Sequence, residues 1–145
     1  MNYWIFVHTG DNATQTFSRL IDNGDWGFDT KRPIRKKVES LRSGDVVLFY
    51  IGGPSGGYFS GEVLLTSDVH APARASIGGP RKMTLDAMVD FDMVNLWGGK
   101  RIDIKDRYVR QKLDFIKNKD KWGMTFGQSI VKISQEDYNQ IKSLL

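Results

Sequence analysis

Two apolar runs joined by a glycine-rich hexapeptide constrain the fold more than any other feature of the chain. Residues 45–51 and 58–65 are rich in β-branched and aromatic side chains, which favour strands. The hexapeptide between them, 52–57, contains four glycines and a proline, so it forms a flexible loop. It lacks the Gly-Lys-Ser/Thr ending of a phosphate-binding loop. We therefore predict an antiparallel hairpin.

Two more segments have the pattern of strands. Residues 3–8 are aromatic or apolar almost without interruption and predict a strand that is buried on at least one face. Residues 83–97 alternate loosely between apolar and polar positions, which predicts a long strand, a turn at 98–99 and a returning segment over 100–104. Residues 66–82 hold two prolines and many small residues and predict a loop.

Three segments carry helical signals. Apolar residues three or four positions apart indicate a short helix that opens at 12–14 and a second one around 35–41. Ser134 and Asp137 are spaced as a capping box, which predicts a C-terminal helix as far as Leu144.

Composition limits the class of protein. The 145 residues are 40% hydrophobic, which suits one core, so we predict a single domain over 1–145 of the α+β class. Cysteine is absent, which excludes disulfides and thiolate metal sites. The net charge of +4 favours a polyanionic partner. The N-terminal apolar run is too short for a signal peptide and no stretch is long enough to span a membrane, so we expect a cytoplasmic protein without a membrane partner.

Catalytic and metal-binding patterns are sparse. The two histidines, His8 and His70, are not spaced as ligands on one helical face, and no serine lies in a nucleophile-elbow pattern. We therefore expect no metal, no cofactor and no catalysis. If the chain were an enzyme, His8 is the obvious acid–base group.

Lysine and arginine are concentrated beside aromatic residues. One cluster directly follows 26–30 and another directly precedes Trp122. Cationic groups hold phosphates with little sequence information, while an aromatic face stacks on an unstacked base for about 1–3 kcal/mol. The other interpretation is a solvated basic face beside core tryptophans. Under the first interpretation the phosphate-binding residues are Lys31, Arg32, Arg35, Lys36, Lys37, Lys117, Lys119 and Lys121.

Trp26 is the aromatic residue with the strongest indication of a binding role. It follows Asn-Gly-Asp at 23–25 and precedes Gly27, without apolar neighbours to share a core position. We therefore expect it to be exposed in a concave site. Trp4 and Trp97, by contrast, lie inside strand-like segments and are expected in the core.

Four motifs in this order resemble the EVE domain family. They are Asn-Tyr-Trp-Ile-Phe at 2–6, Trp-Gly at 26–27, Gly-Asp-Val-Val-Leu-Phe-Tyr at 44–50 and Phe-Ser-Gly-Glu-Val at 59–63. The stretch 113–124 and the final helix are similar to the small single-domain archaeal and bacterial members. The resemblance therefore spans nearly the whole chain.

The resemblance implies a PUA-like fold, a strongly curved barrel of five or six strands with short helices around it. It also implies a relationship to YTH domains, which read methylated adenine in RNA, while EVE domains are linked to modified bases in DNA, often flipped out of the helix. In YTH domains a cage tryptophan follows the first helix, and Trp26 matches that position. Their further cage tryptophans come from the loop after the second hairpin strand, whereas 66–82 contains no aromatic residue here.

Our hypothesis is a nucleic-acid-binding module that recognises a modified base, either methylated adenine or a 5-modified cytosine, without catalysis. The residues assigned to the base pocket are Trp26, Gly27, Thr30, His8, Thr9, Tyr50, Asn118 and Trp122. The alternative is an enzyme or substrate-delivery subunit of RNA or DNA modification that holds a small molecule or nucleotide in the same pocket. DNA and RNA both stay open as partners.

Overall fold

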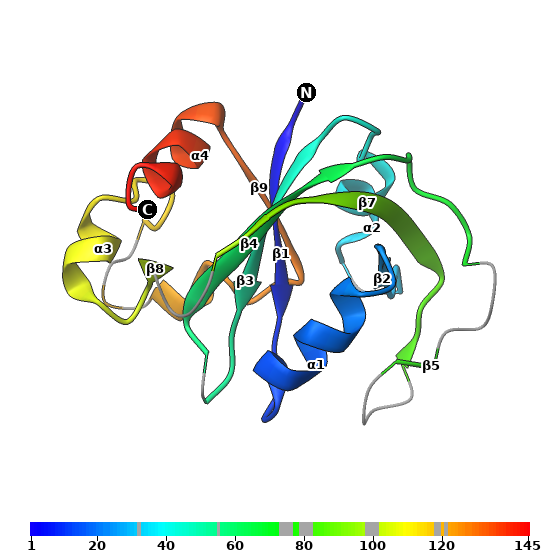
Figure 1. Cartoon of the computed structure of the whole chain (residues 1–145), viewed down its shortest axis with the longest axis horizontal. Coiled ribbons are helices and arrows are strands. Elements are labelled where there is room, and N and C mark those ends of the chain that lie inside the picture. The colour runs from blue at the N-terminus through cyan, green and yellow to red at the C-terminus, as the bar shows by residue number, and fades with distance from the viewer. Residues whose placement is uncertain are drawn as a thin grey trace.

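The computed structural model describes residues 1–31, 33–54, 56–72, 77–78, 83–97, 102–117, 120 and 122–145. Within these ranges the chain forms a main curved sheet with different helices on its two faces, and a separate two-stranded sheet (Figure 1). The strand order is β2-β7-β4-β3-β1-β9, and β8 pairs with β4 beside this path. The described sheet thus has seven strands, where the resemblance implies five or six.

The predicted hairpin is confirmed. β3 (Val46–Ile51) and β4 (Tyr58–Leu65) pair antiparallel, with a shift in register between Phe49 and Tyr50. β1 (Tyr3–His8), also confirmed, lies parallel to β3 along its whole length. A parallel pair needs a crossover connection, and the chain between β1 and β3 supplies it.

The crossover contains α1 (Ala13–Ile21), β2 (Asp25–Phe28) and α2 (Arg35–Glu39). Both helices confirm the predicted ones, although the side chain of Asn12 makes no capping hydrogen bond to α1. β2 contains only four residues, too few for an alternating pattern to stand out in the sequence.

β7 (Ala87–Leu96) pairs with two different strands. Its C-terminal half lies against β4 and its N-terminal half against β2, which curls the sheet. β8 (Ile102–Asp103) returns along β4, and the predicted turn at 98–99 lies outside the described residues.

The segment before β7 differs from the prediction. The long strand expected over 83–97 is broken at 85–86, and β6 (Met83–Thr84) pairs instead with β5 (Ile77–Gly78) inside the segment predicted as a loop. At the break the Asp86 carboxylate accepts hydrogen bonds from Thr30, and the Asp86 N–H donates to the Phe28 carbonyl at 3.0 Å.

The C-terminal part covers the second face of the sheet. β9 (Ile130–Ile133) pairs antiparallel with β1, and α4 (Gln135–Lys142) begins at the predicted capping box. Ser134 Oγ accepts from the Asp137 N–H at 3.0 Å, and Asp137 Oδ2 accepts from the Ser134 N–H at 2.9 Å. In this C-terminal part three short elements were not predicted: β9, α3 (Arg107–Gln111) and the 3-10 turn η1 (Trp122–Met124).

Alternating side chains of the central strands divide the core in two. On β1, Trp4 and Phe6 pack with α1, α2 and β2, and we call this side the α1 face. Ile5 and Val7 pack with the segments around α3, η1 and α4, and we call this side the α4 face. Figure 1 shows the two layers on opposite sides of the sheet. Trp4 and Trp97 are buried, as predicted.

One buried carboxylate ties the beginnings of β1 and β3 together. Asp45 is 2% exposed and accepts hydrogen bonds from the Trp4 indole at 3.0 Å, from the Asn2 N–H at 2.9 Å and from the Arg42 N–H at 3.1 Å. Three donors satisfy a group whose burial would otherwise be unfavourable. Asp45 therefore links the N-terminus to the turn after α2.

We expect Asp45→Ala to lower the free energy of unfolding by about 2–4 kcal/mol, because three donors lose their acceptor and two of them come from the backbone. Asp68→Ala is the matched control. Its exposed carboxylate accepts from the Ser43 N–H at 2.8 Å, and its loss is expected to be about 1 kcal/mol or less. Urea denaturation followed by circular dichroism measures both, and equal losses would contradict the role of Asp45.

Candidate nucleic-acid interface

Trp26 lies in the core of the α1 face. Its side chain is 6% exposed, and its ring lies 4.9 Å from the Phe49 ring and 6.1 Å from the Phe17 ring. The expectation of an exposed tryptophan is therefore wrong. The reason is that β2 pairs with β7, which turns Trp26 inward, and α1 then covers it through Phe17.

His8 and Gly27 lie beside this tryptophan. The His8 ring meets Trp26 edge-on at 5.7 Å, and its Nε2 lies 2.6 Å from Thr16 Oγ1. Burial lowers the pKa of His8 below its ordinary value, so the ring is neutral at pH 7. At Gly27 the flexible side chains of Leu85 and Met88 approach so closely that an added Cβ would lie 2.5 Å and 2.7 Å from them.

Three other assigned pocket residues meet on the opposite side of the sheet. Thr9, Tyr50 and Trp122 line a cavity of about 190 Å³ on the α4 face. A single pocket that unites them with Trp26 is therefore wrong. Phe49 contacts Trp26, whereas Tyr50, the next residue along β3, points to the other face because strand side chains alternate.

Lys105, Phe126 and the glycine backbone of the hairpin loop also line this cavity. None of them was assigned to the site from the sequence. Phe126 is an aromatic residue four positions after Trp122, and this spacing could have indicated it from the sequence. Lys105, by contrast, reaches the cavity only because β8 pairs with β4.

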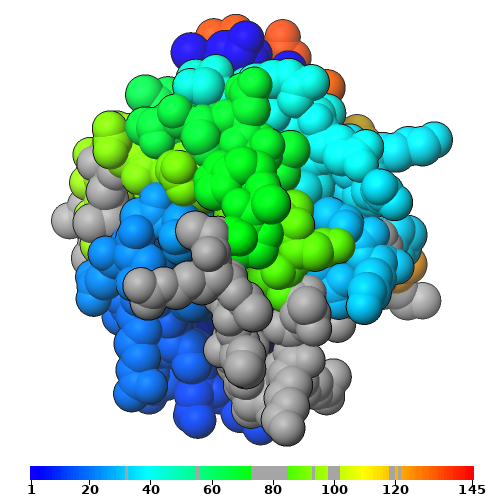
Figure 2. All heavy atoms as spheres, turned by 90° about the vertical axis from the view of Figure 1, so that its right-hand side faces the viewer, coloured from blue at the N-terminus to red at the C-terminus, as the bar shows by residue number. Residues whose placement is uncertain are grey.

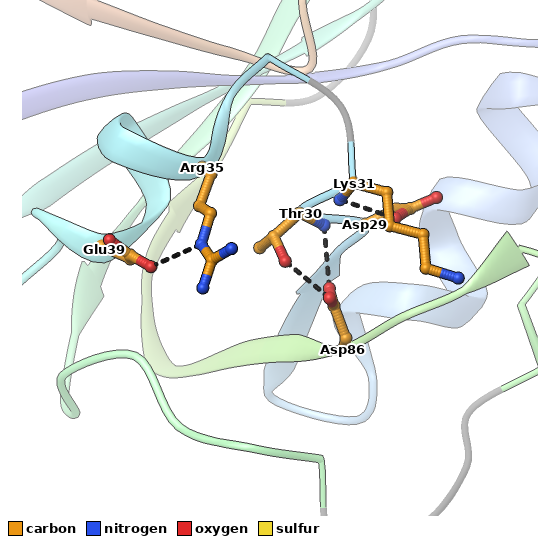
Figure 3. A network of polar contacts seen from close by, with 6 residues as sticks. All are labelled: Asp29, Thr30, Lys31, Arg35, Glu39 and Asp86. Carbon is orange, nitrogen blue, oxygen red and sulfur yellow. Dashed lines mark hydrogen bonds and ion pairs between the residues drawn. The ribbon is translucent and has the colours of Figure 1, made fainter.

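Thr30 lies in a second cavity, of about 340 Å³, which Arg35, His70 and Asp86 also line. Its N–H and its hydroxyl donate to the Asp86 carboxylate at 2.8 Å and 2.5 Å, and these bonds lower the pKa of Asp86. Figure 3 shows this pair beside Arg35, which forms an exposed ion pair with Glu39 at 2.9 Å. Thr30 is therefore already paired, away from Trp26.

The first basic cluster is largely open to solvent. Lys31, Arg35 and Lys36 are exposed, and half-buried Lys37 donates to Gln128 at 2.7 Å. Figure 2 shows the face that carries this segment, coloured cyan, beside the green segment around residues 60–72. In the second cluster Lys117 is exposed. The remaining assigned residues lie outside the described part: Arg32, Asn118, Lys119 and Lys121.

The expectations of no metal site and no membrane span can be compared with the described residues. Within the described ranges, no three His, Asp or Glu side chains gather closely enough to hold a metal ion. In the same ranges, no helix has the length and apolar character needed to cross a membrane. Enzymatic activity and cellular location stay predictions.

Comparisons with known proteins place the fold. No family model matches the chain. Its sequence is 28% identical to UPF0310 protein PYRAB08750 from Pyrococcus abyssi, over the full length of both. Human THYN1 protein, solved in complex with 5-methylcytosine containing DNA, superposes with a TM-score of 0.65 and 13% identity, over 99% of this chain and 97% of that one. The YTH domain of the Zygosaccharomyces rouxii MRB1 protein, solved with N6-methyladenosine RNA, gives a TM-score of 0.57 and 16% identity over 98% and 86%.

The chain thus has the PUA-like fold that EVE and YTH domains share, and the predicted α+β class is confirmed. At identities of 13% and 16% the likeness concerns the fold. The expected resemblance to EVE domains is confirmed at that level.

The burial of Trp26 predicts a large effect on stability. Trp26→Ala should lower the free energy of unfolding by about 3–5 kcal/mol, because it opens a cavity among aromatic rings. Trp122→Ala, at a half-buried position, should lower it by about 1–2 kcal/mol. Urea denaturation compares the two variants, and a smaller loss for Trp26→Ala than for Trp122→Ala would refute the buried position.

His8 predicts how stability depends on pH. Its pKa is lower in the folded chain, so stability falls as pH drops below the ordinary value of 6.5. His70 acts in the opposite sense, because the Ala71 carbonyl and Asp90 raise its pKa and make its contribution largest at low pH. We therefore expect His70→Gln to lose stability more steeply from about pH 7 to about pH 5 than His70→Gln/His8→Gln. Parallel slopes in denaturant titrations would show that His8 is not buried as a neutral ring.

Proposed function

We propose that the chain binds nucleic acid and holds a modified base, methylated adenine or a 5-modified cytosine, against Trp26. The observation that carries the proposal is the place of Trp26 in the fold. It lies on the strand directly after the first helix, beside the end of β1, where the resemblance to YTH domains puts a cage tryptophan. Proteins with this fold were solved with 5-methylcytosine in DNA and with N6-methyladenosine in RNA.

Entry of a base to Trp26 requires α1 to move, because Phe17 of this helix covers the indole ring. Leu85 and Met88 do not cover the ring: they lie against Gly27 on the other face of β2, because side chains alternate along a strand. With α1 displaced, a flipped base would stack on Trp26 with His8 at its edge.

Phosphates would be held by the exposed cluster of Lys31, Arg35 and Lys36. The exposed ion pair of Arg35 with Glu39 is weak enough to be exchanged for a phosphate. Each phosphate that the cluster neutralises releases counterions, so affinity should fall with salt.

The test is a titration of short DNA and RNA oligonucleotides, each unmodified, with N6-methyladenine or with 5-methylcytosine, followed by fluorescence anisotropy. Trp26→Phe keeps an aromatic ring in the core but reduces the stacking area, and should lower the preference for the modified base about three- to tenfold. Trp97→Phe is the matched control, because this tryptophan is also buried but packs on the α4 face, and its preference should be unchanged.

Lys36→Gln should weaken modified and unmodified strands alike and reduce the salt slope by about one. Lys132→Gln, at an exposed position on β9, should leave the slope unchanged. A wild-type chain that binds modified and unmodified strands equally, or a preference that survives Trp26→Phe, would overturn the proposed function.

A further inference from the structure

The cavity on the α4 face is a separate site with its own chemistry. It has a volume of about 190 Å³, and the strands β1 and β3 separate it from Trp26. Three aromatic side chains line it: Tyr50, Trp122 and Phe126. Tyr50 and Phe126 stack with their centroids 3.9 Å apart and their planes at 6°, which fixes both rings.

Tyr50 brings an unused hydrogen-bonding group to this cavity. The residue is 2% exposed and lines the cavity, and within the described residues its hydroxyl has no hydrogen-bond partner. In the described part of the chain, the fully buried side-chain polar atoms without a partner are Trp97 Nε1 and Arg110 Nε, so the Tyr50 hydroxyl is not enclosed and is reached from the cavity. Burial and the charge of Asp103 raise the pKa of Tyr50, so the hydroxyl stays protonated and is available as a donor.

Three glycines of the hairpin loop line one side of the cavity, and their lack of side chains leaves the space in front of Tyr50 open. Gly52, Gly53 and Gly57 line it, and a Cβ on Gly52 or Gly53 would lie 2.8 Å from Thr9 Cγ2 or 2.4 Å from the Gly10 carbonyl oxygen. Side chains larger than hydrogen therefore do not fit there. At the opposite rim an added Cβ on Gly123 would meet nothing within 4 Å, so this side is open.

Positive charge lies at the rim. Lys105 is exposed and lines the cavity, and the Arg110 guanidinium lies 5.7 Å from the centroid of Trp122. Arg110 is held in place because its Nη1 donates to the carbonyls of Ile104 and Lys105, at 2.7 Å and 2.9 Å. Aromatic walls, a free donor and a rim cation together suit a planar heteroaromatic ring that carries an anionic group.

We propose that this cavity binds a nucleotide unit, with the base against Trp122, an acceptor atom of the base on the Tyr50 hydroxyl and the phosphate at Lys105. The nucleotide is either free or part of a nucleic-acid strand. His8 and Thr9 are consecutive where β1 ends, and they lie at the Trp26 site and at the cavity respectively, so both sites adjoin the same end of the sheet. The inference does not require a modified base at Trp26.

Two substitutions test the site without disturbing the core. Tyr50→Phe removes the hydroxyl and keeps the ring stacked on Phe126, while Gly123→Leu places a side chain in open space at the rim. Met124→Leu is the matched control for Gly123→Leu, because Met124 is 75% exposed in the same turn and does not line the cavity. Circular dichroism and urea denaturation establish that each variant is folded.

The probes are the nucleoside 5′-monophosphates and unmodified single strands of about eight nucleotides, titrated by isothermal calorimetry. We expect Tyr50→Phe to weaken binding about tenfold and Gly123→Leu to weaken it more than tenfold, with Met124→Leu within about twofold of wild type. If monophosphates show this dependence, the ligand is a free nucleotide; if the oligonucleotides alone show it, the ligand is a base of a strand.

Affinities that do not change with Tyr50→Phe and Gly123→Leu would overturn the proposal, as would no binding of either probe to the wild-type chain. An equal loss in Met124→Leu would overturn it too. This test uses unmodified probes only, so its result does not depend on the proposed function at Trp26. The proposed function fails on a different measurement, namely when the chain shows no preference between modified and unmodified strands.

Discussion

The parallel pairing of β1 with β3 is the constraint on which the rest of the structure depends. Asp45 connects the beginnings of the two strands, and the Gly52 N–H donates to the His8 carbonyl at 2.8 Å where they end. Because the strands run in the same direction, His8, Thr9 and Gly52 emerge at one end of the sheet. Both proposed sites begin at that end.

The alternation of side chains then divides this end between two faces. Trp26 belongs to a packed aromatic group with Phe6, Phe17 and Phe49, and that group contributes to stability whether or not a base is bound. A base bound at Trp26 would therefore meet rings that are already ordered, which lowers the entropic cost of binding. The α4-face cavity differs, because its rings leave a space.

The α4 face is secured by a buried charge. Glu62 is 5% exposed and accepts hydrogen bonds from the Tyr138 hydroxyl and from the Lys142 ammonium group. A buried carboxylate is tolerated when its partners are complete, and removing one of them leaves an uncompensated charge. These hydrogen bonds hold α4 against β4. Ile141 of α4 then packs in the same core cluster as Phe126.

The sequence by itself determined the strands of the hairpin, β1, both crossover helices and the capped C-terminal helix, because each carries a local pattern of side-chain spacing or capping. It also indicated Thr9, Tyr50 and Trp122 as pocket residues, and these three do meet. It did not determine which residues share a face. The burial of Trp26 follows from the pairing of β2 with β7, which are separated by some sixty residues of chain. Tyr50 points away from Trp26 because the two core clusters pack on opposite faces of the sheet, and this packing fixes which positions of β3 face α1. Such contacts join residues distant in sequence, so only the tertiary structure decided them.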